Sequence, residues 1–231
     1  MHKENGFTLI EITIVLVIIA LLLGSVIKGQ ELIASARVRN LISQQDGIKA
    51  AYFGFLDRFR ALPGDYVLAS ANIANVAGTA NGNGNGQIRS IAGGDAIDEH
   101  IAVWDHLSKA GFINGTYTYA AGAETTASAP TNPFGRYLQM IFDSVYDPPG
   151  PPARHNLKTG NHIPSDLLAE VDSKIDDGSA TGGSFRFSAY PGQSAGGGTA
   201  PTGPGSCYAA AAPNNWISNA PIPVCGGASL F

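Results

Sequence analysis

A single acid, Glu11, stands inside an otherwise uncharged apolar stretch that runs from Phe7 to Ile27. As a helix this stretch would be about 31 Å long, close to the thickness of the hydrocarbon core of a bilayer. An ionised carboxylate in hydrocarbon costs about 2.5 kcal/mol or more, so the chemistry expected of Glu11 is to pair with a cation. The alternative is that Glu11 lies near a helix end and reaches the polar headgroups.

The residues before this stretch, MHKENG at positions 1–6, are polar and contain no apolar segment of their own. A secretory signal places its small-residue cleavage site after the apolar run. Here the candidate cut, between Gly6 and Phe7, lies before the run. The apolar segment would therefore stay on the mature protein.

The string GFTLIE at residues 6–11, followed by an uncharged apolar helix, resembles the prepilin N-terminus of type IV pilins and type II secretion pseudopilins. The resemblance covers about the first tenth of the chain. It implies that Gly6 is the cleavage residue of a prepilin peptidase and that Phe7 becomes the N-methylated terminus. It also implies that Glu11 pairs with a neighbouring subunit's N-terminal amine during assembly.

Elementary electrostatics agrees with that implied role of Glu11. Cleavage would leave a cationic amine on Phe7, and a buried carboxylate without a cation is strongly disfavoured. In a bundle of staggered subunits, each Glu11 could meet the amine of the next subunit. The acid would then set the register between subunits.

Two cysteines, Cys207 and Cys225, stand 18 positions apart near the C-terminus. Two cysteines in an exported chain suggest one disulfide, and the alternative is a pair of free thiols. In the chain-entropy model a disulfide of this spacing stabilises the fold by about 3 kcal/mol. Pilins commonly close a C-terminal loop in this way, so the resemblance extends to this end of the chain.

An Asn-Gly repeat supplies a candidate calcium loop. Asn81, Asn83 and Asn85 place oxygens at alternate positions before Gly86 and an aliphatic residue, as in the first half of an EF-hand loop. The three side chains are neutral, however, and the twelfth position of the loop is alanine where an EF-hand has glutamate. The alternative is a flexible polar loop without a metal.

A calcium ion at this loop would need acids from further along the chain. The candidates are Asp95, Asp98 and Glu99, any of which would have to fold back onto the repeat. No other cofactor is expected from the sequence.

Catalytic patterns are weak. Residues 192–196 match the G-x-S-x-G serine elbow, but that elbow needs a helix directly after the serine and GGTAP follows here. His100 and His106 are not spaced as i, i+4 partners and have no nearby cysteine, so a zinc site is not expected. We therefore expect a protein that is not an enzyme.

The apolar helix is predicted to continue well beyond Ile27, because no proline occurs before Pro63. Steps of three and four residues define one face of the helix, made of Ala34, Val38, Leu41, Gln45, Ile48, Tyr52, Phe55, Phe59 and Leu62. Such a heptad seam is typical either of a coiled coil or of a helix covered by its own globular domain, and we favour the second interpretation. The Pro63-Gly64-Asp65 turn is predicted to end the helix.

Shorter elements are predicted further along the chain. Two helices are expected over residues 98–112 and 164–177, the first capped by Asp98. Strands are expected over residues 116–120, 137–142 and 185–190.

Composition narrows the function class. The net charge is −4, which gives no reason to expect nucleic acid as the main partner. Of the 14 prolines, 13 lie in the second half, together with about half of the 29 glycines, which indicates loop-rich β structure there. The chain of 231 residues is long enough for one membrane helix and one domain of ordinary size.

The predicted fold class is α+β and pilin-like: a long N-terminal helix, membrane-spanning in its first half, packs on a C-terminal antiparallel β-sheet head. We expect a leader at 1–6, a transmembrane or filament-core helix at 7–29, the outer half of the helix at 30–62, and a globular head at 63–231.

The function implied by the resemblance is that of a type IV pilus subunit that polymerises through its N-terminal helix. The alternatives are a type II secretion pseudopilin and a membrane-anchored binding or adhesive protein. The implied partners are other copies of the chain, a prepilin peptidase, an inner-membrane assembly platform and minor pilins. The implied location is the bacterial inner membrane with a periplasmic head, followed by an extracellular filament.

Overall fold

The computed structural model describes residues 8–147, 150–192 and 200–231. The chain divides into two compact units, residues 1–37 and residues 38–231. The long helix α1, Leu9–Phe59, contributes its first part to one unit and its remainder to the other. It ends at Phe59, three residues before the predicted last helical residue Leu62, and is followed by Arg60 in the left-handed region with φ 55°.

Within the second unit, the seam predicted along α1 is buried. The residues concerned are Val38, Leu41, Gln45, Ile48, Tyr52 and Phe55. All of them except Gln45 pack against residues of the same unit in two apolar clusters. This confirms that the chain's own globular domain covers the seam.

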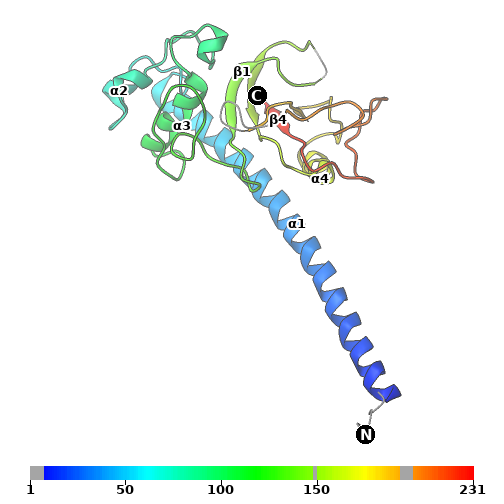
Figure 1. The fold of residues 1–231 in the computed structure, drawn as a ribbon. Helices are drawn as coiled ribbons and strands as arrows, with labels where there is room; N and C mark the ends of the chain where they lie inside the picture. Colours follow the sequence, from blue (N-terminus) through cyan, green and yellow to red (C-terminus); the bar gives the residue numbers. More distant parts are fainter. Residues whose placement is uncertain (1–7, 148–149, 193–199) are drawn as a thin grey trace. The chain divides into compact units, whose positions relative to one another are not determined.

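The two apolar clusters pack against different parts of α1. One joins Ile48, Tyr52 and Phe55 to helix α3 (Glu99–Lys109) and to strand β1 (Gln139–Asp143). The other joins Val38 and Leu41 to helix α4 (Ser165–Ile175) and to the two cysteines. Figure 1 shows α3 beside the last turns of α1, and α4 on the side of the head that carries the C-terminal segment.

One four-stranded antiparallel sheet forms the β part of the head. Its other strands are β2 (Arg154–Lys158), β3 (Phe185–Phe187) and β4 (Gly227–Leu230), and the strand order is β1-β2-β4-β3. Register is set by pairs such as Met140 opposite Leu157 in β1–β2. The long helix and this sheet confirm the predicted α+β, pilin-like arrangement.

Between α1 and α3 the chain forms only short elements. These are the helix α2 (Ala69–Asn72) and two 3-10 turns, Gly78–Ala80 and Ile91–Gly93. Asparagine and glycine, which are frequent in this segment, favour turns over long regular elements.

The strand predicted over residues 116–120 is wrong. Two of its backbone N–H groups donate to side chains of α3: Tyr117 to Ser108 Oγ at 3.2 Å, and Tyr119 to Asp105 Oδ2 at 2.9 Å. The Thr118 N–H between them makes a single backbone bond, to the Ala127 carbonyl at 2.8 Å. Because helical side chains satisfy these donors, no ladder forms.

Asp98 stands directly before α3, as predicted, but its side chain does not cap that helix. Its two oxygens instead accept the backbone N–H groups of Ile91 at 3.0 Å and Gly122 at 2.9 Å. The prediction of a capping role for Asp98 is therefore wrong, because two loops compete for its carboxylate.

Candidate functional site

Helix α1 begins with a pair of reciprocal hydrogen bonds between Thr8 and Glu11. The Thr8 backbone N–H donates to Glu11 Oε2 at 2.8 Å, and the Glu11 N–H donates to Thr8 Oγ1 at 3.3 Å. The Thr8 hydroxyl also donates to Glu11 Oε2, at 2.7 Å. This is a capping box, which satisfies backbone donors that a helix N-terminus leaves free.

The capping box gives Glu11 a local role that the sequence reasoning missed, although the T-x-x-E spacing at residues 8–11 signals it. All three hydrogen bonds use one carboxylate oxygen or the threonine hydroxyl, and none uses Glu11 Oε1. The Glu11 side chain is exposed, and its Oε1 atom takes no part in the cap. It can therefore take a cation from another molecule without losing the cap.

The proposed cleavage pair, Gly6 and Phe7, lies outside the described residues. Directly after it, the apolar side chains of α1 are exposed, for example Leu16 at 59 % and Leu22 at 60 %. Among the residues that the structure describes, α1 is the single helix whose length and composition would let it cross a membrane. An apolar surface of this extent calls for a lipid or protein partner.

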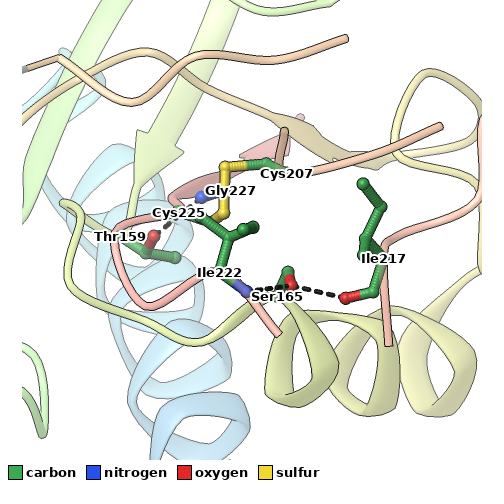
Figure 2. The surroundings of a disulfide bond; sticks show 7 residues. All are labelled: Thr159, Ser165, Cys207, Ile217, Ile222, Cys225 and Gly227. Carbon is green, nitrogen blue, oxygen red and sulfur yellow. Dashed lines mark hydrogen bonds between the residues drawn. A yellow bond between two sulfur atoms is a disulfide. The ribbon is translucent and has the colours of Figure 1, made fainter. Parts of the chain in front are cut away.

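The Cys207–Cys225 disulfide is formed, which confirms the pairing predicted from the two cysteines (Figure 2). The Cα atoms are 5.6 Å apart, and both cysteines are fully buried. They lie in the apolar cluster that contains Val38 and Leu41 of α1. The disulfide therefore fastens the C-terminal segment onto the core of the head.

Hydrogen bonds around the disulfide hold the enclosed segment to the rest of the head. Figure 2 shows Ser165, the first residue of α4, between two points of that segment: its hydroxyl donates to the Ile217 carbonyl and accepts the Ile222 N–H. Beside them, the Gly227 N–H donates to Thr159 Oγ1 at 2.9 Å.

Trp216, inside the disulfide loop, makes a second link to α4. Its indole N–H donates to Asp172 Oδ2 at 2.7 Å, and both side chains are buried. Burial raises the pKa of Asp172 to about 6, although the indole N–H acts in the opposite direction. The arrangement positions the loop on α4.

The three asparagine side chains of the Asn-Gly repeat do not share one set of partners. Asn81 turns to α2, where its Oδ1 accepts the Ser70 N–H at 2.8 Å. Asn83 and Asn85 instead donate their side-chain amides to one oxygen, Asp95 Oδ1, at 2.8 and 3.0 Å. Of the acids expected to fold back, the structure therefore brings Asp95 to the repeat.

Glu99, another of the acids expected to fold back, also reaches the repeat. Its Oε1 accepts the Asn83 backbone N–H at 2.9 Å, and its side chain is fully buried. Burial, with a smaller contribution from the neighbouring Asp95 and Asp65, raises the pKa of Glu99 to about 8, although the Asn83 N–H acts in the opposite direction. Asp65, from the turn after α1, was missed by the sequence reasoning; it accepts the N–H groups of Asn85 and Gly86 at 3.0 and 2.8 Å.

A second acidic group lies at the end of α4, where Asp172, Asp176 and Asp177 each offer an oxygen within 4.8 Å of the others. Their carboxylates are already used as acceptors: Asp172 by Trp216, Asp176 by the N–H groups of residues 184 and 185, and Asp177 by the N–H of residue 179. These contacts make the group a set of loop anchors.

His106 has a structural position. Its Nδ1 accepts the Gly64 N–H at 2.9 Å and its Nε2 lies 2.9 Å from the Ala80 carbonyl, so the neutral ring clamps two loops. Burial lowers its pKa to about 4. The Nε2 atom of His100 lies 3.6 Å from Oε1 of Glu124. The serine of the G-x-S-x-G string lies outside the described residues.

Comparison with known families gives one match, the prokaryotic N-terminal methylation motif, at residues 1–27. This match contains Gly6, Phe7 and Glu11 and confirms the resemblance to the prepilin N-terminus that these residues indicated. The chain matches none of the curated proteins or solved structures with which it was compared.

Proposed function

We propose that this chain, which carries the N-terminal signature of type IV pilins and pseudopilins, is a structural subunit of a type IV pilus. The observation that carries the proposal is the methylation motif placed directly before an exposed apolar helix. Before assembly the helix anchors the subunit in the bacterial inner membrane with its head in the periplasm. In the filament the same apolar surface packs against other copies.

Two features favour a pilus over a secretion pseudopilus. The disulfide closes a C-terminal segment onto the head, as is common in pilins. In addition, 231 residues less the six of the leader leave a mature chain of 225, which is larger than most major pseudopilins. A pseudopilin remains the second candidate because the apolar half of α1 lacks the bend-producing proline that many pilins carry.

Cells that express the chain are expected to carry shearable surface filaments that contain it, and cells lacking its gene are expected to lose them. Electron microscopy of both strains, with immunolabelling of the head, makes the measurement. Loss of protein secretion with no change in long filaments would instead identify a pseudopilin. A chain recovered only in the membrane fraction would identify an anchored binding protein.

The subunit in filaments is expected to begin at Phe7, with one methyl group that adds about 14 Da to the N-terminal peptide. Gly6→Ala should leave Met1 in place and keep the chain out of filaments, because the peptidase cuts after that glycine in the prepilin family. Asn5→Ala, a leader change one residue earlier, is the matched control and should be processed normally. Intact-protein mass spectrometry reads both outcomes, and Met1 on assembled wild-type protein would contradict the prediction.

A further inference from the structure

Asparagine directly followed by glycine occurs at several places in the chain. One pair, Asn5–Gly6, belongs to the predicted leader and lies outside the described residues. Three pairs make up the Asn-Gly repeat at residues 81–86, and a further pair is Asn114–Gly115. Asparagine is one of the thermolabile residues of proteins. A following glycine favours its reaction, because glycine has no side chain to hinder the backbone nitrogen that attacks the amide.

The glycine N–H groups of the repeat are all hydrogen-bonded. The Gly82 N–H donates to the Tyr66 carbonyl at 3.1 Å. The Gly84 N–H donates to the Asp65 carbonyl at 3.0 Å, and the Gly86 N–H donates to Asp65 Oδ2 at 2.8 Å. At Gly82 the backbone passes so close that an added Cβ would lie 2.3 Å from the carbonyl carbon of Asp65. Attack by any of these three nitrogens therefore requires the repeat to open first.

The side-chain amides of the repeat are held as well. The Asn81 amide donates to Ser70 Oγ at 3.0 Å. The amides of Asn83 and Asn85 both donate to Asp95 Oδ1, at 2.8 and 3.0 Å. Each asparagine of the repeat is thus fixed at both of the groups that would have to meet.

Asn114–Gly115 lies in the exposed loop that follows α3. Within the described part of the chain, neither the Gly115 N–H nor the Asn114 side chain takes part in a hydrogen bond. The loop is anchored to α3 on either side, through the N–H groups of Phe112 at 2.9 Å and Tyr117 at 3.2 Å. Gly115 itself has φ 99°, a conformation that favours glycine. The nitrogen and the amide carbon that would react are therefore both free, in a segment open to water.

We propose that Asn114 is a site of spontaneous deamidation in the folded protein. The deprotonated backbone nitrogen of Gly115 attacks Cγ of Asn114, so that an N–Cγ bond forms and the Cγ–Nδ2 bond breaks. The amide group leaves as ammonia, and the proton that it takes up balances the one lost by Gly115. Water then adds to either carbonyl of the resulting cyclic imide and opens it to aspartate or isoaspartate. Water is the single co-reactant.

The reaction would change one surface of the head. Asn114 lines a groove together with Gln44, Gly47 and Ile48 of α1. Either product places a carboxylate there, ionised at neutral pH, which takes the net charge of the chain from −4 to −5. Isoaspartate also lengthens the backbone by one carbon between the two anchored ends of the loop. Older molecules would thus carry a more acidic groove than newly made ones.

The test follows deamidation in the full chain, purified in detergent and kept in mildly alkaline buffer without ammonium salts. Peptide mapping by mass spectrometry should show the Asn114 peptide becoming about 1 Da heavier and separating into two products. This should be faster than at any asparagine of the repeat by about tenfold or more, because the repeat must open before it reacts. The rate at Asn114 should rise with hydroxide concentration, since the nucleophile is a deprotonated nitrogen.

Unfolding the same chain in guanidinium provides the internal control. Asn114 and the three asparagines of the repeat should then react at similar rates, because the folded structure no longer protects the repeat. Asn114→Asp supplies a chromatographic standard for one product. Asn114→Gln should stay unmodified at this position, because its longer side chain would have to close a larger ring.

Asp65→Ala tests the source of the protection. It removes the acceptor of the Gly86 N–H and should raise the rate at Asn85, whereas the matched control Asp177→Asn should leave that rate unchanged. The comparison within the wild-type chain does not depend on how well the Asp65 variant folds. Equal rates at Asn114 and the repeat in the folded wild-type chain would overturn the proposal. So would an Asn114 that stays intact when folded although all four asparagines react after unfolding.

Discussion

Replacing Glu11 by glutamine is expected to abolish most filament assembly while leaving membrane insertion, leader cleavage and the folded head intact. In the filament, the apolar helices would pack together, and an unpaired carboxylate there would be expensive. A staggered neighbour's amine removes that cost at one axial offset. Loss of one partner of a buried pair costs roughly 3–5 kcal/mol, which weakens the addition of each subunit by about 10²- to 10⁴-fold.

The capping box allows the charge of Glu11 to be tested separately from its contribution to the helix cap. Glutamine accepts the Thr8 N–H at this position as well as glutamate does, so Glu11→Gln removes the charge and keeps the cap. Thr8→Ala keeps the charge and removes the threonine hydroxyl from the cap, which lowers the local stability of the helix by about 1 kcal/mol. The Thr8→Ala variant should therefore assemble far better than Glu11→Gln. The measurement is the yield of sheared filaments at equal membrane amounts. Wild-type yield from Glu11→Gln would show that the acid serves only as a cap.

The double substitution Cys207→Ala, Cys225→Ala is expected to lower the free energy of unfolding by about 3 kcal/mol. For a chain of this size that corresponds to a fall of roughly 6–12 °C in the midpoint of thermal unfolding. Alanine is chosen because both cysteines are fully buried among apolar side chains, where a serine hydroxyl would add a cost of its own. Fluorescence of Trp216, which lies inside the loop, follows the transition in the detergent-solubilised full chain.

Two controls separate the crosslink from the side chains. The wild-type chain under reducing conditions should unfold near the midpoint of the double variant, whereas the double variant itself should not respond to reductant. Limited proteolysis should find new cuts between residues 208 and 224 first, because that segment loses its covalent closure. An unchanged midpoint in the double variant would contradict a stabilising role for the disulfide.

The parts of this molecule that could be predicted from sequence are those governed by local pattern. The seam on α1 repeats every three or four residues, so Val38 through Phe55 identify a buried face without any knowledge of what covers it. The disulfide could be predicted because the chain has two cysteines, so that each has a single possible partner within the chain. The apolar run and the polar leader before it can be recognised from consecutive residues alone.

Competition between distant partners explains where prediction failed. Asp98 has the right type and place to cap α3, but the N–H groups of Ile91 and Gly122 take its oxygens. Residues 116–120 alternate like a strand, yet α3 side chains satisfy their donors. Asp65 joins the Asn-Gly repeat across about twenty residues of sequence, a distance over which no periodicity carries information.

The position of β4 in the sheet has a consequence for how the head is made. Gly227–Leu230 pairs on one side with β2 and on the other with β3, so an inner strand of the sheet is the last of the four to be synthesised. Until it arrives, β2 and β3 each keep an open edge that can pair with the wrong chain. In the exported subunit proposed above, the sheet therefore could not be completed before residue 230 has been translocated. Premature arrest would leave a recognisably unfinished protein, open to quality-control proteases.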